Sequence, residues 1–302
     1  MVEVAVVLPA YNEAKRLKNA VSESIQYLSE ITDSFEIIIA EDGSTDGTDK
    51  IAESLEKKYP FVKHLHSDER LGKGKALKRA FLSTDAEILV YYDVDLSTDL
   101  KHLKPLVDAI RNGFDISIGS RILKKSNVKR TFKREFASRG FNFLVRFLLK
   151  SKIHDHQCGF KAFKRRSILP LLGEVKDNHW FWDTEILVRA QKKGMKVNEF
   201  PVDWKHGGVS KVEFKRDVIA IGINILKLWF EFSSMPLYVM FLISFLILAS
   251  ILLYAGVKDV LGLYIILYSR CKYNYSLHFC NCLFPLMDIQ RIKVRENGWI
   301  HH

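Results

Sequence analysis

The chain has 302 residues, a formal net charge of +11 at pH 7 and a pI near 9.3. This length suits one large α/β domain with one attachment, and it excludes two full-sized catalytic domains. The positive charge implies an anionic partner, and nucleic acid, a lipid surface and a phosphorylated substrate all meet that requirement.

Short apolar runs that end in polar, turn-rich segments open the sequence. Val4 to Leu8 and Glu36 to Ala40 are typical of strands, whereas Glu13 to Leu28 and Thr48 to Lys58 are typical of helices. The resulting β-α-β order predicts an α/β fold with a mostly parallel sheet. We therefore expect the ligand site at the carboxyl ends of its strands.

Two further strands run directly into charged residues. Ile88 to Tyr92 leads into Asp93-Val94-Asp95, and Asp115 to Ile118 leads into Gly119-Ser120-Arg121. An Asp-x-Asp pair is usually a solvated turn, but at a strand end two carboxylates can converge on one hard divalent cation. The position after a predicted parallel strand therefore favours a site.

Two glycine-containing segments precede these strand ends. Gly72-Lys73-Gly74-Lys75 lets a backbone approach phosphate, although it lacks the wider spacing of a phosphate loop and alone is typical of a flexible turn. Asp42 to Thr48 combines turn glycines with helix-capping residues. It indicates at least a tight strand-to-helix connection, and the functional interpretation adds a carboxylate facing a ribose or base.

Two amphipathic helices follow, at about 132–150 and at 213–232. The first carries a stripe at helical spacing, comprising Arg139, Asn142, Arg146 and Lys150. The second repeats apolar residues at helical spacing, comprising Phe214, Val218, Ile221, Ile225 and Leu228. Both patterns suit a membrane interface, and ordinary packing on the sheet is the alternative.

The C-terminal region, 233–302, is predicted to be embedded in a membrane. Pro236 to Gly256 contains no charged residue and is long enough to span a bilayer as a helix. Val260 to Tyr268 is too short to span, and Ser276 to Ile289 resumes the apolar pattern. A second span, a re-entrant segment and an interfacial helix all fit this remainder.

Charge and cysteine usage favour the cytoplasm for the rest of the chain. The N-terminus lacks the basic region and apolar stretch of a secretory signal, and basic residues near the C-terminus, Arg291, Lys293 and Arg295, hint at a return to the same side. The four cysteines are few and unevenly placed, which argues against a disulfide framework. His154, His156 and Cys158 lack a second ligand pair at metal-site spacing.

Four motifs occur in the order and spacing of glycosyltransferase family 2, which the sequence resembles. They are Leu8 to Glu13, Asp42 to Thr48, Gly72 to Ala76 and Asp93 to Leu96. Later segments resemble the dolichyl-phosphate β-glucosyltransferases and the related mannose synthases, namely Gly119 to Arg121, Gln157 to Lys161, Trp180 to Leu187 and Glu199 to Trp204. The resemblance covers roughly Val4 to Lys211 and implies a GT-A fold, with 1–212 as the catalytic domain.

The resemblance also implies a donor site. The nucleoside would be surrounded by Pro9, Tyr11, Glu13, Glu41 and Asp42. Lys73 would lie near the nucleotide, and Asp93 and Asp95 would hold Mg²⁺ or Mn²⁺ against the diphosphate. Glu41 departs from the family pattern, which commonly has a second aspartate there, and this departure leaves the base or ribose contact open.

The implied acceptor site is built from basic residues. Arg121 and Arg134 match arginines that the mannose synthases aim at the acceptor phosphate, and Ser210-Lys211 matches a segment that closes over the donor. A guanidinium fork suits phosphate geometry. Asp183 takes the place of the catalytic carboxylate, but because a phosphate acceptor is already anionic, a positioning role fits it as well as that of a base.

The implied reaction is an inverting transfer of glucose from UDP-glucose to a dolichyl or polyprenyl phosphate, with GDP-mannose and UDP-N-acetylglucosamine as alternative donors. A processive synthase would carry Gln-x-x-Arg-Trp, which is absent. The acidic stretch Asp93 to Asp99 argues against a non-catalytic membrane- or nucleic-acid-binding protein. We expect nucleotide sugar, polyprenyl phosphate and membrane lipids as partners, no nucleic acid, and an integral membrane protein with its catalytic domain on the cytoplasmic face.

Overall fold

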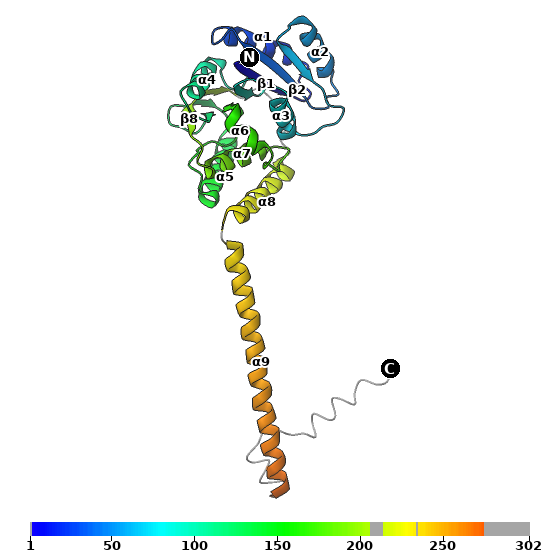
Figure 1. Cartoon of the computed structure of the whole chain (residues 1–302), viewed down its shortest axis with the longest axis vertical. Coiled ribbons are helices and arrows are strands. Elements are labelled where there is room, and N and C mark those ends of the chain that lie inside the picture. Colours follow the sequence, from blue (N-terminus) through cyan, green and yellow to red (C-terminus); the bar gives the residue numbers. More distant parts are fainter. Residues whose placement is uncertain (1, 206–213, 234, 275–302) are drawn as a thin grey trace. The chain divides into compact units, whose positions relative to one another are not determined.

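The computed structural model describes residues 2–205, 214–233 and 235–274. The chain divides into two units, Met1–Phe232 and Ser233–His302. The first unit is a sheet covered by helices, and the described part of the second is one long helix, α9 (Figure 1).

Seven strands form one mixed sheet in the order β3-β2-β1-β4-β7-β5-β8. They are β1 (Val4–Ala10), β2 (Phe35–Glu41), β3 (Val62–Leu65), β4 (Ile88–Tyr92), β5 (Ile116–Ser120), β7 (Phe160–Lys164) and β8 (Val197–Pro201). The predicted mostly parallel sheet is confirmed. β7, which the sequence did not reveal, is the exception, because it runs antiparallel to both of its neighbours, β4 and β5.

Helices cover both faces of this sheet. The helices α1 (Leu17–Ser29), α2 (Thr48–Lys58) and α4 (Leu103–Arg111) share one core with alternate strand residues such as Val4 and Val6. On the other face, α3 (Lys73–Leu82), α6 (Arg165–Leu172) and α7 (Trp182–Lys192) share a second core with Ala5 and Val7. Since both faces are buried, the central strands are apolar throughout rather than alternating.

The first helix begins later than the sequence predicted. It was expected from Glu13, but α1 starts at Leu17. The intervening backbone is bound by the loop after β2, because Glu13 donates its N–H to Thr48 Oγ1 at 2.8 Å and Ala14 donates to Asp46 Oδ2 at 3.1 Å. The predicted helix Thr48 to Lys58 is confirmed as α2.

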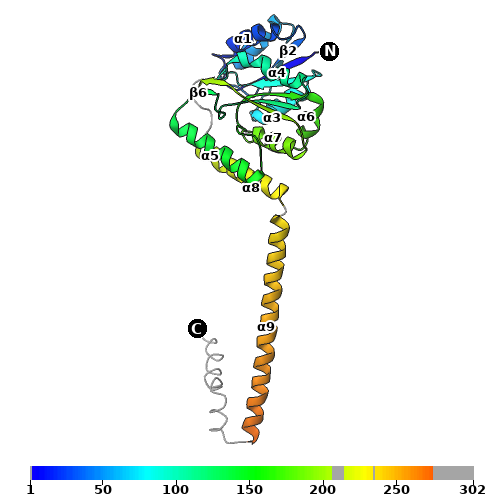
Figure 2. The ribbon, with the colours of Figure 1, turned by 90° about the vertical axis from the view of Figure 1, so that its left-hand side faces the viewer.

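The helices α5 (Phe132–Leu149) and α8 (Phe214–Phe232) lie side by side below the sheet (Figure 2). They share a small apolar core with α7 and the residue before it, formed by Val145, Leu149, Phe181, Val188, Ile225 and Leu228. The predicted stripe on α5 is wrong at Asn142, which is buried because its amide oxygen accepts the backbone N–H of His156 at 2.9 Å.

Two short strands, β6 (Asn127–Lys129) and β9 (Asp203–Lys205), pair in parallel as a second sheet, and η1 (Leu100–His102) is a 3₁₀ turn before α4. β9 follows β8 after the single residue Val202. After β8 the chain thus passes from the large sheet to the second sheet, where β9 pairs with β6 in the segment that follows Arg121.

In the second unit, α9 runs unbroken from Met235 to Asn274 and contains one candidate membrane span, Leu237–Cys271, with a mean hydropathy of 2.5. The predicted span Pro236 to Gly256 lies within α9. Val260 to Tyr268 continues the same helix and is not a separate element. From Leu237 to Val257 the helix rises about 30 Å, the thickness of a bilayer's hydrocarbon core.

Charged residues, Lys258 and Asp259, follow that stretch directly. Cys271 is disulfide-bonded, which the sequence did not predict. The predicted apolar run Ser276 to Ile289 and the basic residues Arg291, Lys293 and Arg295 lie outside the described residues.

Candidate active site

The carboxyl ends of β1, β2, β4 and β5 meet at one edge of the sheet, where the sequence placed its site residues. β7 begins at this edge because it is antiparallel, and Tyr92 therefore pairs with Phe160. Asp93 donates its backbone N–H to the carbonyl of Gly159 at 3.3 Å. A Cβ at residue 159 would lie 2.2 Å from an Asp93 carboxylate oxygen, so only glycine leaves that carboxylate room.

Lys73, the first residue of α3, joins two of the predicted carboxylates. Its Nζ lies 2.9 Å from Asp93 Oδ1 and 3.6 Å from Asp183 Oδ2. Burial alone would lower the pKa of Lys73, but the charges of Asp93 and Asp183 outweigh it and raise the pKa above its ordinary value. A permanent cation therefore lies between the two acidic groups.

The position of Lys73 follows from the close approach of α3 to α7. A Cβ on Gly74 would lie 2.6 Å from Cβ and Cγ of Trp182, so the absence of a side chain lets the two helix starts touch. Lys75 donates its N–H to the carbonyl of Asn178 at 3.2 Å. The Gly-Lys-Gly-Lys segment is thus a packed helix start and not a flexible turn.

Asp183 lies in the first turn of α7 and is 4% exposed. Its Oδ1 is 2.7 Å from Nζ of Lys161, a fully buried lysine on β7, and it also accepts a hydrogen bond from the hydroxyl of Tyr91. Lys161 donates further to Tyr91 Oη at 2.9 Å and to the carbonyl of Cys158 at 2.5 Å.

Sequence reasoning missed Lys161 and Tyr91 as site residues. The available signal was weak: a lysine inside the Gln157–Lys161 motif, and a tyrosine two residues before Asp93, at the end of the strand Ile88–Tyr92. In the structure both fix the Asp183 carboxylate from the sheet side, while Lys73 contacts it from α3.

Burial is also the main influence on the protonation of Asp183 and Lys161. It raises the pKa of Asp183 to about 6, against the opposing charge of Lys73. It lowers the pKa of Lys161, since a charged ammonium is costly where no water reaches it. Buried groups with displaced pKa values are candidates for function.

Asp93 and Asp95 are both partly exposed, and the Asp93 side chain retains 46% of its accessible surface. Asp95 Oδ1 accepts the backbone N–H of Ser97 at 3.0 Å, which fixes the turn. These carboxylate oxygens are exposed to solvent, and Gly159 beside them has no side chain to cover them. They are therefore suitable ligands for a hard divalent cation.

The loops after β1 and β2 are tied together beside this edge. Asn12 donates its N–H to Ser44 Oγ at 3.0 Å, and its side-chain oxygen accepts the N–H of Thr45 at 2.8 Å. The guanidinium of Arg70 lies 4.1 Å from the ring centre of Tyr11. Of the predicted nucleoside residues, Tyr11 and Glu13 belong to this tied segment, and Pro9 lies near the end of β1.

Glu41 and Asp42 are buried, and their carboxylates bind protein groups. Asp42 accepts the N–H groups of Leu71 and Gly72 at 2.6 and 3.0 Å, which holds the approach to α3. Glu41 accepts the N–H of Ser44 at 2.5 Å and contacts His66 Nδ1 at 2.6 Å. Their direct contact with a nucleoside stays a prediction.

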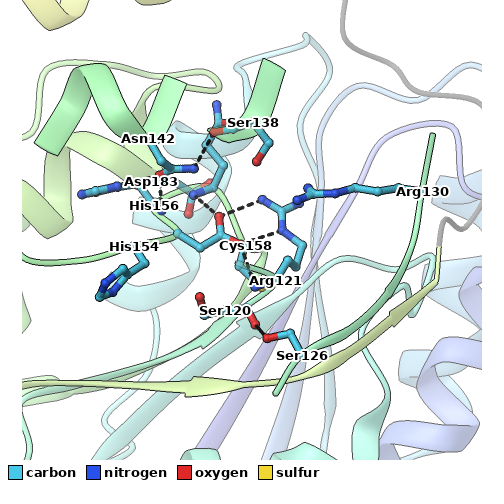
Figure 3. Close-up of polar contacts among 12 residues, drawn as sticks. Ser120, Arg121, Ser126, Arg130, Ser138, Asn142, His154, His156, Cys158 and Asp183 are labelled. Atoms are coloured by element: carbon cyan, nitrogen blue, oxygen red, sulfur yellow. Dashed lines mark hydrogen bonds and ion pairs between the residues drawn. The ribbon is translucent and has the colours of Figure 1, made fainter. Parts of the chain in front are cut away.

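Arg121, at the end of β5, forms a bidentate pair with Asp155. Its Nε and Nη2 lie 2.8 and 2.9 Å from the two carboxylate oxygens, and its backbone N–H donates to the same group at 2.9 Å (Figure 3). Asp155 is fully buried. Burial would raise the pKa of Asp155, but the Arg121 guanidinium lowers it to about 2.

The other predicted acceptor residues differ in their surroundings. Arg134 is exposed in the first turn of α5. Arg130, which sequence reasoning missed, has a side chain only 5% exposed, bonds Glu135 through Nε at 2.5 Å, and extends toward Arg121 in Figure 3. Ser210 and Lys211 lie outside the described residues.

Buried polar atoms remain unpaired among the residues drawn around Arg121 in Figure 3. Within the described parts of the chain, Nη2 of Arg130 and the hydroxyls of Ser138 and Ser120 have no hydrogen-bond partner. His156 is neutral here, because burial lowers its pKa to about 3. Buried donors without partners are rare in native proteins, and they indicate a place where a ligand or water completes the bonding.

Comparison with known proteins agrees with this geometry. The family model "Glycosyl transferase family 2" matches residues 5–170. Glycosyltransferase AglD of Haloferax volcanii is 48% identical over 238 residues, which cover 78% of this chain but only 38% of that relative's length. Dolichyl-phosphate beta-glucosyltransferase ALG5A of Trichomonas vaginalis is 33% identical over 239 residues, covering 75% of this chain and 73% of the relative.

Among solved structures, glucosyl-3-phosphoglycerate synthase from Mycobacterium tuberculosis, in complex with UDP, superposes with a TM-score of 0.55 at 19% identity. The match covers 76% of this chain and 79% of that chain. This likeness concerns the fold, and it confirms the predicted GT-A architecture.

The fold and the relatives together define the class of protein as a glycosyltransferase. The chain belongs to glycosyltransferase family 2 and is a hexosyltransferase.

We expect activity to depend on ionised Asp183. Because burial raises its pKa to about 6, the carboxyl keeps its proton at lower pH. The ratio kcat/KM should therefore fall about tenfold per pH unit below that value. The measurement is the pH profile of sugar transfer between pH 5 and 8.

A phosphate acceptor also titrates near this range, so the control is Lys73→Met, which removes the cation that lowers the pKa of Asp183. Losing the adjacent cation raises the pKa of Asp183 and moves the acidic limb to higher pH, whereas titration of the acceptor would leave the limb in place. An unshifted limb in this variant would remove Asp183 as its source.

We expect Arg121 to be needed for stability as well as for function. Arg121→Ala leaves Asp155 buried without its partner, which should lower the free energy of unfolding by about 3–5 kcal/mol. The exposed Arg134→Ala should change it by less than about 0.5 kcal/mol. Urea denaturation of the detergent-solubilised chain measures both, and equal midpoints for the two variants would contradict the pairing.

Proposed function

We propose that this glycosyltransferase moves glucose from UDP-glucose to a dolichyl-type polyprenyl phosphate and inverts the sugar's configuration to give a β-linked product. Relatives named dolichyl-phosphate beta-glucosyltransferase, at about one third identity over most of their length, support this choice of acceptor and sugar.

The acceptor assignment rests on buried hydrogen-bond donors, drawn around Arg121 in Figure 3, that have no partner in the described chain. Arg130 Nη2 and Ser138 Oγ are buried without partners in the described chain. A phosphate offers several strong acceptors and a negative charge, and guanidinium groups suit both. Ser138 lies on α5, whose exposed phenylalanines include Phe136 and Phe143. A lipid-linked phosphate entering along that helix would satisfy the orphaned groups.

The donor would bind on the side of Asp93 that faces away from the acceptor groups around Arg121. Asp93 and Asp95 would hold Mg²⁺ or Mn²⁺, which supplies positive charge to the leaving diphosphate when bound. Lys73 keeps Asp93 in place from behind and adds fixed positive charge to the same region. The loops carrying Tyr11 and Asp42 would enclose the nucleoside.

The chemistry is one in-line displacement. An oxygen of the acceptor phosphate attacks the anomeric carbon, a new C–O bond forms, and the bond to the nucleoside diphosphate breaks with both its electrons leaving on the diphosphate. Because the attacking oxygen is already anionic, no proton need be removed. Asp183, held by Lys73, Lys161 and Tyr91, would orient the sugar.

The helix α9 would anchor the enzyme in the membrane, and the exposed aromatic side chains of α5 would contact lipid. We place the catalytic unit on the cytoplasmic side, where excess Lys and Arg are retained and nucleotide sugars are available.

A transfer assay tests this proposal. The full chain, in detergent with polyprenyl phosphate and Mg²⁺ or Mn²⁺, should transfer labelled sugar from UDP-glucose and far less from GDP-mannose or UDP-N-acetylglucosamine. Asp95→Asn should reduce the rate by at least about 100-fold while leaving the helix content unchanged.

The product should be β-linked and extractable with lipid. Preference for another nucleotide sugar would overturn the donor assignment, and release of free glucose without lipid product would overturn the acceptor assignment. Full activity of Asp95→Asn in excess chelator would contradict the role given to the carboxylate pair.

A further inference from the structure

A second cluster of metal-binding side chains lies at the end of the edge strand β3, and it shares Glu41 with the predicted nucleoside site. His64 and His66 are two residues apart, so their side chains share one face of the sheet. β2 pairs with β3 in a register that puts Ala40 opposite Leu65, and Glu41 therefore follows beside His66.

The three side chains converge. One ligand atom from each of Glu41, His64 and His66 lies within 4.8 Å of the other two. Glu41 is 1% exposed, its Oε2 is 2.6 Å from His66 Nδ1, and the two imidazole rings are 5.8 Å apart. Two imidazoles and a carboxylate thus point into one small volume.

His64 supplies an independent observation. Its Nε2 is buried and has no hydrogen-bond partner among the residues that the structure describes. An unpaired buried ring nitrogen costs free energy that a bond to a ligand would recover. The hydrogen bond between His66 and Glu41 leaves this nitrogen unsatisfied.

Burial is the main influence on His64 and lowers its pKa, which keeps the imidazole neutral and able to bind a metal, while the carboxylates of Glu41, Glu56 and Asp49 act in the opposite direction. Asp68 Oδ1 lies 3.2 Å from Nε2 of His66 on the solvent side.

We propose that Glu41, His64 and His66 form a binding site for one transition-metal cation of the Zn²⁺ class. Imidazole nitrogens select Zn²⁺, Co²⁺ or Ni²⁺ over Mg²⁺, so this site differs chemically from the Asp93/Asp95 pair. Two histidines and one carboxylate are also a known donor set for zinc sites that keep a fourth position open.

Metal binding requires only a small rearrangement. Ligands at about 2.0–2.2 Å from a tetrahedral ion lie a little over 3 Å apart, so the contact between Glu41 and His66 must widen slightly. The side chain of His66 is 48% exposed and has room to move.

The bound ion would act as a clip on the donor loop. The second oxygen of Glu41 accepts the N–H of Ser44, and Ser44 Oγ accepts the N–H of Asn12. A metal that fixes Glu41 would therefore fix the loop after β2 and, through it, the loop after β1. The proposed metal site therefore has a structural role, and this role does not depend on the identity of the sugar or of the acceptor.

The test is Co²⁺ titration of the full chain, purified without a histidine tag, stripped of metal and kept in excess Mg²⁺ to occupy hard-cation sites. Wild-type protein should bind one equivalent, seen as visible Co²⁺ absorption that Zn²⁺ abolishes. His66→Ala and His64→Ala should each weaken binding by more than about 100-fold, since even loss of an outer-shell partner costs about 10- to 100-fold.

Two matched controls should retain the site. His154→Ala removes a histidine that also contacts a glutamate, Glu199 at 2.9 Å, but that belongs to no such cluster in the described residues. The double variant Asp93→Asn/Asp95→Asn removes the hard-cation carboxylates. Absence of Co²⁺ binding by the wild type, unchanged affinity in His66→Ala, or loss of binding in the double variant would each overturn the proposal. His66 is half-exposed, so its variant keeps the test valid if His64→Ala fails to fold.

Discussion

The contact on which the site depends is the ammonium of Lys73 between the carboxylates of Asp93 and Asp183. These three residues come from the start of α3, the end of β4 and the start of α7. Without the cation, the buried carboxylate of Asp183 would face the half-exposed carboxylate of Asp93, and the two like charges would repel each other. Glycine at position 74 permits this arrangement, because α3 can then lie against Trp182.

The antiparallel strand β7 explains how one edge serves two binding tasks. The segment leading into it delivers Asp155 to Arg121, and the strand itself delivers Lys161 to Asp183. An all-parallel sheet would send those residues to its opposite edge. β7, which lies between β4 and β5, thus connects the carboxylates proposed for the sugar donor with the guanidinium groups proposed for the acceptor phosphate.

The sequence predicted the parts of this structure that depend on local patterns. Apolar runs ending in polar residues located β1, β2, β4 and β5, and ordered motifs brought Lys73, Asp93 and Asp183 to attention before any geometry was known. β7 was missed because Phe-Lys-Ala-Phe-Lys has the alternation of a half-exposed segment, whereas Lys161 is buried by partners from distant elements. The error at Asn142 has the same origin, since helical spacing cannot tell which side His156 will cover. Contacts such as Glu41 with His66 join residues whose separation carries no local signal.

A kinetic double-mutant cycle tests the central claim, that Lys73 and Asp183 act as one unit. The ratio kcat/KM for sugar transfer would be measured for wild type, Lys73→Met, Asp183→Asn and the double variant. If the ammonium works through its contact with Asp183, the double variant should be little slower than the slower single variant, with a coupling free energy of at least about 1 kcal/mol. Losses that multiply, with no coupling, would show that the two residues act independently and would contradict this account.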